Sequence, residues 1–248
     1  MEKTIAAIIL AAGKGTRINL PNINKVAYIF RGKPIIRYGI DLLNPLVSKT
    51  VVVVGSHAQS VKDSLMGYDV VYAVQHEQLG TGHAVKVGME LLYDFKPSNI
   101  LVGYGDHMMH YQQSSIKAML DMHVNSKSAL TLVVSKYNEI EKLGYGRIVR
   151  NKDGNIVSIV EQNDADEKTR QIKEFNAGLY CFQSEFLKKY ISRIVPSPVS
   201  KEYYLTDLVR LAIDAGEKVL PFYLPYHEVG IGINSRQDLE KSSKIHNI

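Results

Sequence analysis

The chain has 248 residues, with 30 lysine and arginine residues against 25 aspartate and glutamate residues, which gives a formal net charge of +5. Hydrophobic residues make up 45% of the sequence and charged residues 22%, so the composition excludes disordered, collagen-like and disulfide-stapled proteins. The length is sufficient for one large α/β domain or two small ones.

The first predicted element is a strand over residues 5–10, within an apolar run that ends at residue 12. This run is much shorter than the roughly 20 residues that a membrane-spanning helix needs. No small-residue cleavage site of the kind that ends a secretory signal follows it. We therefore expect a buried strand, no membrane partner and a cytoplasmic protein.

Short β-branched segments alternate with segments of helical periodicity through the first half of the chain. The expected strands are residues 5–10, 50–54, 70–74, 100–102 and 130–134, and the expected helices are residues 34–46, 56–65, 81–93 and 114–123. Thr81 is expected to cap the third of these helices. This order predicts βαβ units and a mixed, mostly parallel sheet flanked by helices.

The second half begins with two alternating runs, residues 146–150 and 156–160, joined by an Asp-Gly turn that predicts a β-hairpin lobe. A strand over 178–182, helices over 184–194 and 206–215, a strand over 219–223 and a closing helix from residue 235 follow. The basic segment 168–173 is interleaved with polar residues, which favours an exposed helix face over a nucleic-acid surface. Cys181 is the only cysteine and cannot form an internal disulfide.

The segment Leu10-Ala-Ala-Gly-Lys-Gly-Thr-Arg17 comes directly after the first strand. Small residues allow backbone N–H groups to approach phosphate oxygens, and Arg17 adds a planar charged fork, so the segment predicts a polyphosphate-binding loop. It matches neither a Walker A loop nor a dinucleotide fingerprint, which would need glycine at Ile18. A tight turn with exposed charges is the plain alternative.

Further motifs follow this loop in order along nearly the whole chain. They are Asn24-Lys25-Val26, Gly32-Lys33-Pro34, the segment 75–84, Tyr104-Gly105-Asp106, Gly144-Tyr145-Gly146, Ile159-Val160-Glu161, Asn176-Ala177-Gly178, the segment 202–207 and Gly232-Ile233-Asn234. Together they resemble the sugar-1-phosphate nucleotidyltransferase family, most closely the uridylyltransferase (pyrophosphorylase) domain of bacterial N-acetylglucosamine-1-phosphate uridylyltransferase. The resemblance implies a Rossmann-like α/β fold of the nucleotide-diphospho-sugar transferase type.

With no repeat or linker in the sequence, we expect one domain, residues 1–248, with a nucleotide-binding half over about 1–135 and an acceptor-binding half over about 136–248. The resemblance implies an enzyme that joins a nucleoside triphosphate to a sugar 1-phosphate and releases pyrophosphate. The acceptor phosphate is itself the nucleophile, so catalysis consists of positioning and charge neutralisation.

Arg17 and Lys25 match the family's catalytic basic residues, and Asp106 and Asn234 match its Mg²⁺ ligands. Two protein oxygens are sufficient for Mg²⁺, because substrate phosphates and water complete its coordination. For Lys25 the plain alternative is a surface lysine, and for Asn234 it is a helix N-cap.

The resemblance also implies the residues that bind the two small-molecule substrates. The nucleotide-binding set is Leu10, Ala11, Ala12, Gly13, Lys14, Gly15, Thr16, Gln75, Gly80 and Thr81. The acceptor-binding set is Tyr104, Gly146, Glu161, Asn176, Tyr204 and Thr206. For Glu161 the plain alternative is an exposed position at the end of a strand. The sequence gives no indication of the oligomeric state.

The resemblance implies that Gln75 lies in the family's pyrimidine-binding segment, and its amide can pair with uracil or with cytosine when it rotates by half a turn. A helix entry with polar caps is the plain alternative for this segment. UTP with N-acetylglucosamine 1-phosphate is the favoured pair. A CTP-dependent enzyme acting on another phosphorylated small molecule in surface-polysaccharide decoration is the alternative. A non-catalytic nucleotide sensor is the alternative of a different class, although Arg17, Lys25 and Asp106 are all present.

Several positions depart from the family pattern. Residues 107–109 are His-Met-Met where relatives have Val-Pro-Leu. Asn24 stands where relatives have a proline, and the segment between Arg17 and Lys25 is one residue longer than in relatives. On the acceptor side, Asn163 stands where relatives have a lysine. No hexapeptide-repeat helix occurs before Ile248, so we expect either a stand-alone pyrophosphorylase or part of a longer chain.

Two other groups of residues suggest metal sites that we do not expect. His107 and His110 lack a third ligand at a spacing suited to zinc. Asp164-Ala-Asp166 matches the metal motif of sugar-transferring enzymes, but it follows the hairpin in a polar run, where we expect a solvated loop.

Overall fold

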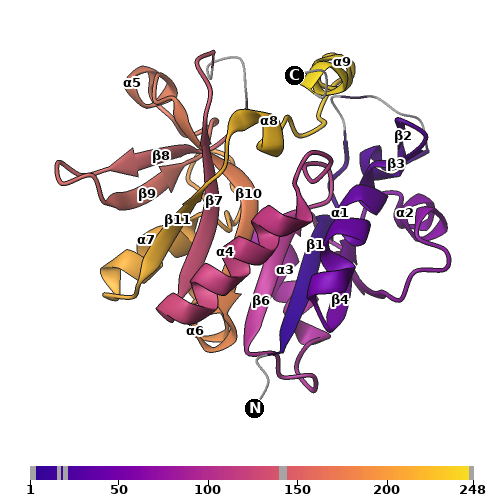
Figure 1. Cartoon of the computed structure of the whole chain (residues 1–248), viewed down its shortest axis with the longest axis horizontal. Helices are drawn as coiled ribbons and strands as arrows, with labels where there is room; N and C mark the ends of the chain where they lie inside the picture. Colours follow the sequence, from indigo (N-terminus) through magenta and orange to yellow (C-terminus); the bar gives the residue numbers. More distant parts are fainter. Residues whose placement is uncertain (1–3, 16–17, 19–21, 140–143, 246–248) are drawn as a thin grey trace.

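Strand β1 (Ile5–Ala11) lies within a mixed nine-stranded sheet in the computed structural model of the chain, which describes residues 4–15, 18, 22–139 and 144–245 (Figure 1). The main path of the sheet has the order β11-β7-β10-β6-β1-β4-β5. Its strands are β11 (Val219–Tyr223), β7 (Leu130–Lys136), β10 (Glu174–Gln183), β6 (Asn99–Tyr104), β1, β4 (Lys49–Val54) and β5 (Val71–Val74). The predicted fold class is confirmed.

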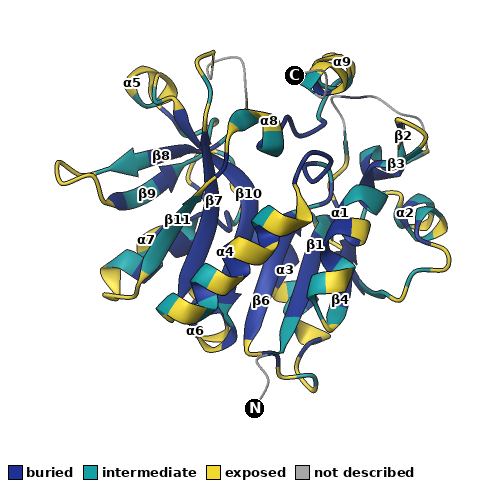
Figure 2. Cartoon of the chain, in the orientation of Figure 1, coloured by how far each residue is buried: buried dark blue, intermediate teal, exposed yellow. Residues whose placement is uncertain are grey.

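Helices cover both faces of this sheet (Figure 2). Alternate residues of β1 face opposite sides, because Ala6 and Ile8 belong to one apolar cluster and Ala7 and Ile9 to the other. The first cluster includes residues of α3 (Thr81–Glu90), α6 (Ser184–Tyr190) and α7 (Asp207–Asp214). The second includes residues of α1 (Ile35–Leu43), α2 (Ala58–Ser64), α4 (Gln113–Ser126) and α8 (Tyr226–Val229).

Strand β10 is antiparallel to both of its neighbours in the main path, β6 and β7, whereas β1 is parallel to β4 and β6. The first residues of β10 therefore lie at the same edge of the sheet as the last residues of β1 and β6. The register of β10 against β7 shifts between Asn176 and Tyr180, where Gly178 has a φ of +73°. This edge is where open α/β sheets bind ligands.

The predicted hairpin is present as β8 (Arg147–Arg150) and β9 (Ile156–Val160), and it projects from the main sheet (Figure 1). The side chain of Asn151 organises its turn by accepting hydrogen bonds from the N–H groups of Asp153 and Asn155. Strand β8 meets β10 through one register pair, Phe175 with Arg147. The exposed segment 168–173 includes the end of the short helix α5 (Glu167–Arg170), as expected for a solvated face.

The structure also contains elements that the sequence did not predict. They are the two-stranded sheet β2 (Ile29–Phe30) with β3 (Lys33–Pro34), helix α8, and the short 3-10 helices η1 (Lys25–Ala27), η2 (Asn44–Leu46) and η4 (Ile191–Arg193). Helices α1 and α6 end earlier than predicted, and η2 and η4 occupy the last residues of the two predicted helices. Each element is too short to show a hydrophobic period.

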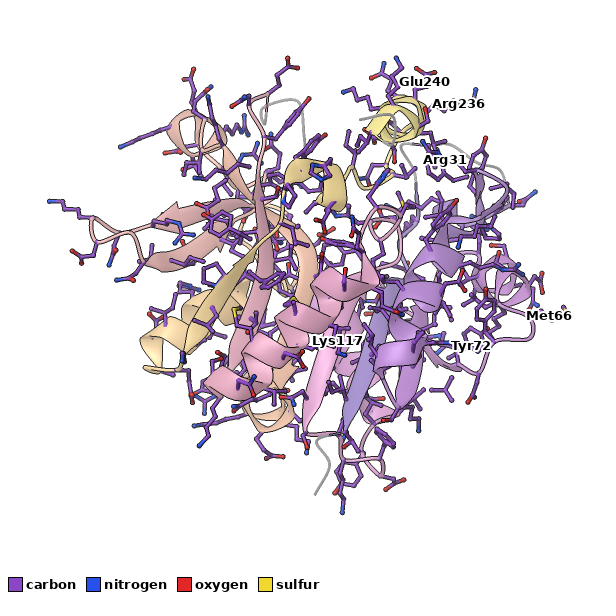
Figure 3. All side chains as sticks on the ribbon, viewed as in Figure 1. Arg31, Met66, Tyr72, Lys117, Arg236 and Glu240 are labelled. Carbon is purple, nitrogen blue, oxygen red and sulfur yellow. The ribbon has the colours of Figure 1, made fainter. Side chains whose placement is uncertain are left out.

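The closing helix α9 (Arg236–Lys244) packs beside the β2–β3 turn (Figure 3). The guanidinium of Arg31 donates to the carbonyl of Ser243 on α9, and Leu239 packs on the apolar cluster that contains Phe30. These contacts hold the segment that precedes α9, including Asn234, near the edge of the sheet. Within the described residues, the helices are all too short or too polar to cross a lipid bilayer.

Candidate active site

A cavity of about 560 Å³ opens at the carboxyl edge of β1 and β6. Among the described residues, its lining consists of Leu10, Ala11, Ala12, Gly13, Lys14, Gly15, Asn24, Lys25, Val26, Gln75, Gln78, Gly80, Thr81, Ala84, Tyr104, Asp106, His107, Gly144, Tyr145, Glu202, Gly232 and Asn234. It therefore gathers segments from both ends of the chain at one edge of the sheet.

The glycine-containing loop after β1 forms one wall of this cavity. Gly15 has a φ of +62°, and a Cβ added there would lie 3.3 Å from the Cβ of Lys25, so the loop passes close to the lysine. The loop also lies close to the residue that follows β4, because a Cβ added to Gly55 would lie 2.8 Å from the carbonyl oxygen of Ala12. Thr16 and Arg17 lie outside the described residues.

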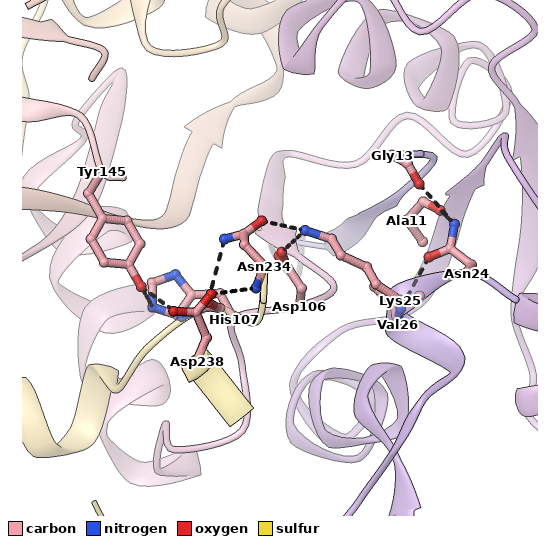
Figure 4. A network of polar contacts seen from close by, with 11 residues as sticks. Ala11, Gly13, Asn24, Lys25, Val26, Asp106, His107, Tyr145, Asn234 and Asp238 are labelled. Carbon is pink, nitrogen blue, oxygen red and sulfur yellow. Dashed lines mark hydrogen bonds and ion pairs between the residues drawn. The ribbon is translucent and has the colours of Figure 1, made fainter. Parts of the chain in front are cut away.

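Lys25, Asp106 and Asn234 meet at one point of the cavity, although 209 residues separate the first from the last (Figure 4). The Lys25 ammonium donates to the Asp106 carboxylate and, over 2.8 Å, to Oδ1 of Asn234. The Lys25 side chain is only 16% exposed, so the surface-lysine alternative is wrong.

The alternative role for Asn234, capping the last helix, is also wrong. Ser235 is the N-cap of α9, and its hydroxyl accepts from the N–H of Asp238. The Asp238 carboxylate in turn accepts from the main-chain N–H of Asn234 over 3.0 Å. The cap thus leaves the Asn234 amide oxygen directed at Lys25.

The Asp106 and Asn234 oxygens are suited to a hard cation. One is a carboxylate and the other an amide carbonyl, which are the donor types that Mg²⁺ prefers, and both already bond a single positively charged group. His107 and His110 have other partners: the ring of His107 bonds the hydroxyl of Tyr145 over 3.2 Å, and that of His110 bonds Ser242 over 2.7 Å. The described residues contain no cluster of three or more His, Cys, Asp or Glu side chains suited to a metal.

The Gln75 amide, a predicted base contact, is held in one orientation. Its nitrogen lies 3.2 Å from the carbonyl of Gly80 and 3.0 Å from Nδ1 of His83. Because a carbonyl can only accept, the amide must direct its NH₂ group to Gly80, which leaves its oxygen as the acceptor for another partner.

Thr81 does not cap α3 as expected. The capping position is Gly80, whose φ of 112° and ψ of 178° suit glycine, and the Thr81 hydroxyl accepts from the N–H of Leu205 over 2.9 Å. The carbonyl of Tyr203 also accepts from Gly82. The start of α3 is thus tied to the segment that carries two predicted acceptor residues, Tyr204 and Thr206.

Four predicted acceptor residues belong to two hydrogen-bonded groups, one with Asn176 and Tyr104 and one with Glu161 and Thr206. Asn176 donates to the hydroxyl of Tyr180 over 2.5 Å, and Tyr180 lies 3.4 Å from the hydroxyl of Tyr104. Glu161 accepts from the hydroxyl of Thr206 over 2.8 Å. Among the described lining residues, only Tyr104 comes from the predicted acceptor set.

Glu161 is not an exposed strand end. A Cβ added to Gly146 would lie 3.3 Å from both of its carboxylate oxygens, so glycine at this position leaves them room. Burial raises the pKa of Glu161, and the charges of Asp164, Asp207 and Glu202 raise it further, against the hydrogen bond from Thr206. A ligand that donates hydrogen bonds to this carboxylate would stabilise its charged form.

Asp164 is not simply solvated, as the sequence had suggested. Its carboxylate accepts from the Ser197 hydroxyl over 2.7 Å and from the Tyr204 hydroxyl over 3.4 Å. It therefore positions Tyr204 from the turn that follows β9.

Sequence reasoning missed Tyr145, His107 and Asn24 as parts of the site. The Tyr145 hydroxyl accepts from the N–H of Gly232 over 2.7 Å, and its ring stacks on His107 with centroids 5.1 Å apart. Tyr145 thus links the hairpin to the segment that carries Asn234. Its place between two glycines was the only local signal.

Comparisons with known proteins identify the family of the chain. The family model described as nucleotidyl transferase matches residues 6–226. The protein named bifunctional protein GlmU from Brevibacillus brevis is 36% identical over 238 residues, or 96% of this chain and 50% of the relative. Proteins of the same name from Exiguobacterium sibiricum and Clostridioides difficile are 38% and 37% identical, over 95% and 96% of this chain and 51% of each relative. The chain spans about half the length of these relatives.

Proposed function

The chain belongs to the nucleotidyl transferase family and is a nucleotidyltransferase enzyme, and we propose that it joins UTP to N-acetylglucosamine 1-phosphate and releases pyrophosphate. The observation that carries this proposal is the meeting of Lys25, Asp106 and Asn234 beside the glycine-containing loop in one cavity.

In the proposed reaction, an oxygen of the acceptor phosphate forms a bond to the α-phosphorus of UTP. The bond from the α-phosphorus to the oxygen bridging to the β-phosphate breaks, and that oxygen leaves with pyrophosphate. The chain supplies position and charge rather than a nucleophile. We assign the phosphate contacts to the Lys25 ammonium, to main-chain N–H groups of the loop 10–15, and to Arg17, which lies outside the described residues.

The charge of the cavity supports a requirement for a divalent cation. Among its described lining residues, the positive charges of Lys14 and Lys25 are balanced by the negative charges of Asp106 and Glu202. A triphosphate carries several negative charges, so this lining alone cannot neutralise it. We propose that Asp106 and Asn234 hold Mg²⁺, which when bound would neutralise phosphate oxygens.

We assign the contact with the pyrimidine base to the side-chain amide of Gln75. Its oxygen remains to accept a hydrogen bond, because its nitrogen is directed to Gly80 and His83. Uracil can donate to this oxygen from N3 and cytosine from its N4 amino group, so our choice of UTP rests on the resemblance to uridylyltransferases and is tested by the nucleotide panel below.

On the acceptor side, we assign hydroxyl contacts to the Glu161 carboxylate and amide contacts to Asn176. Both lie in the half that contributes the hairpin and β10, which we propose binds the sugar, whereas residues up to about 135 bind the nucleotide. Tyr204 and Thr206 hold their neighbours Asp164 and Glu161 through hydroxyl groups. This arrangement suits a polyhydroxylated sugar phosphate.

The direct test is pyrophosphate release with UTP, CTP and dTTP, each paired with N-acetylglucosamine 1-phosphate, glucose 1-phosphate and phosphocholine. We expect UTP with N-acetylglucosamine 1-phosphate to give the highest kcat/KM, and Mg²⁺ chelation to abolish turnover. Asp106→Ala should be inactive but folded, with Asp153→Ala in the hairpin turn as the matched control. Faster turnover with CTP would replace the nucleotide assignment, and no turnover with any pair would refute the proposal.

A further inference from the structure

Asn24 lies against the glycine-containing loop at the wall of the cavity and is almost completely buried, at 1% exposure. Its amide nitrogen is 3.1 Å from the carbonyl oxygens of Ala11 and of Gly13 (Figure 4). It is also 2.8 Å from the carbonyl oxygen of Ser56. The two hydrogens of the amide are thus shared among three carbonyl groups. Asn24 therefore ties the loop to the segment that follows β4.

The other atoms of Asn24 organise the segment that carries Lys25. Its side-chain oxygen accepts from the N–H of Val26 over 3.1 Å and caps the 3-10 helix η1. Its main-chain N–H donates to the Ser60 hydroxyl on α2 over 2.9 Å. Lys25 is the first residue of η1, so the position of this helix fixes the Cα of Lys25, whose ammonium donates to Asp106.

The hydrogen bonds to the loop also orient its peptide groups. In a trans peptide the carbonyl and the N–H of one plane point in opposite directions. With the carbonyls of Ala11 and Gly13 directed at Asn24, the N–H groups of Ala12 and Lys14 point away from it. Ala12 and Lys14 both line the cavity, and we assign these N–H groups to the wall that would receive an anion.

We propose that Asn24 is a positioning residue that sets the anion-binding loop and Lys25 relative to each other through a single amide. The inference rests on the proposed function, because it assigns both the loop and Lys25 to the triphosphate. Asn24 itself does not touch the reacting atoms; it acts by holding groups that do. A rigid supporting contact of this kind matters because a displacement of about 1 Å can lower a rate by about 100-fold.

The kinetic test compares Asn24→Ala with wild type at saturating acceptor. We expect kcat/KM for UTP to fall by about 100-fold, with the KM for the sugar phosphate within twofold of wild type. Asn24→Ser can still cap η1 but cannot bridge the loop carbonyls, so it should recover only part of the loss.

The matched control is Asn99→Ala. Asn99 is another buried asparagine, in β6, and its side-chain oxygen bonds the ring of His123 over 3.1 Å. This variant should lower the Tm while leaving kcat/KM within twofold of wild type. If Asn24→Ala lowers the Tm in the same way and also leaves kcat/KM within twofold, the inference is refuted.

A binding measurement separates this inference from the proposed function. Inorganic tripolyphosphate, titrated calorimetrically, reports on the anion-binding wall without a base or a sugar. We expect Asn24→Ala to weaken its binding by at least tenfold, whichever nucleotide and acceptor the enzyme uses. If tripolyphosphate binds wild type and variant equally, or binds neither, the positioning role is refuted.

Should Asn24→Ala fail to fold, Ser60→Ala provides a milder perturbation. It removes the acceptor of the Asn24 main-chain N–H and a hydrogen bond from the Ser60 hydroxyl to the carbonyl of His57, but it leaves the Asn24 side chain intact. We expect a severalfold loss of kcat/KM and of tripolyphosphate affinity. Unchanged values for both would refute the inference.

Discussion

Replacing Tyr145 with phenylalanine removes one oxygen and keeps the ring. That oxygen accepts from the N–H of Gly232 over 2.7 Å, and the ring stacks on His107 and on Phe175 at centroid distances of 5.1 and 4.9 Å. The stacking should survive, but the N–H of the buried Gly232 loses its acceptor and the ring of His107 loses the same hydroxyl as a partner. An unpaired buried donor costs about 1–3 kcal/mol, and 2 kcal/mol corresponds to a Tm decrease of about 4–8 °C for a chain of this size.

The same change should raise the Mg²⁺ concentration that gives half-maximal activity. Gly232 lies two residues before Asn234, so freeing its N–H loosens one of the two proposed ligands. The assay is a Mg²⁺ titration of pyrophosphate release beside a thermal melt. Tyr38→Phe is the control, because its hydroxyl donates to the carbonyl of Phe30 away from the cavity and should affect only the Tm. An unchanged Mg²⁺ requirement together with a lowered Tm for Tyr145→Phe would refute the link to Asn234.

Three further changes test the charge and backbone assignments. Lys25→Met should lower kcat/KM by about 100- to 1,000-fold in the pyrophosphate assay, and a loss below tenfold would contradict its role. Burial raises the pKa of Glu161 in the folded chain above its ordinary value in the unfolded chain. The ionised carboxylate therefore lowers the stability of the fold at a pH above the folded-state pKa, and this loss is absent at a pH below the ordinary value. Glu161→Gln should therefore raise the Tm at neutral pH, match wild type near pH 4 and lower activity; equal melting at both pH values would contradict this. Gly178→Ala should destabilise by at least about 1–3 kcal/mol in urea, because φ is +73° and the new Cβ would lie 2.6 Å from Cδ2 of Tyr104; an unchanged urea midpoint would show that the bulge can relax.

Much of the fold was predictable because its longer elements have clear periods. The apolar run that forms β1 and the alternating runs of the hairpin needed no tertiary information. Strand β10 was recognised only from residue 178, although it begins at Glu174. Its first residues include Asn176 and a bulge at Gly178, and these break the pattern of a buried strand.

The site was predictable where its residues follow strands in the same half. The loop after β1 and Asp106 after β6 must lie at one edge, because parallel neighbouring strands end there. Asn234 was identified only from the family resemblance, since no local pattern connects it with Asp106. The contacts of Tyr145 and Asn24 depend on segments that approach only in the folded chain, so neither could be derived from spacing.

The attachment of the hairpin has a consequence for the range of acceptors. Gly146 and Glu161 flank its two strands, yet the β8–β9 pair joins the main ladder through one residue pair, Phe175 with Arg147. A slight tilt of this lobe would change the width available to a sugar without breaking the strand pairings that hold the nucleotide side. If the acceptor binds here as we propose, exchanging residues at the base of the hairpin should change the size of acceptor that is used, while the contacts of Lys25 with Asp106 and Asn234 are kept.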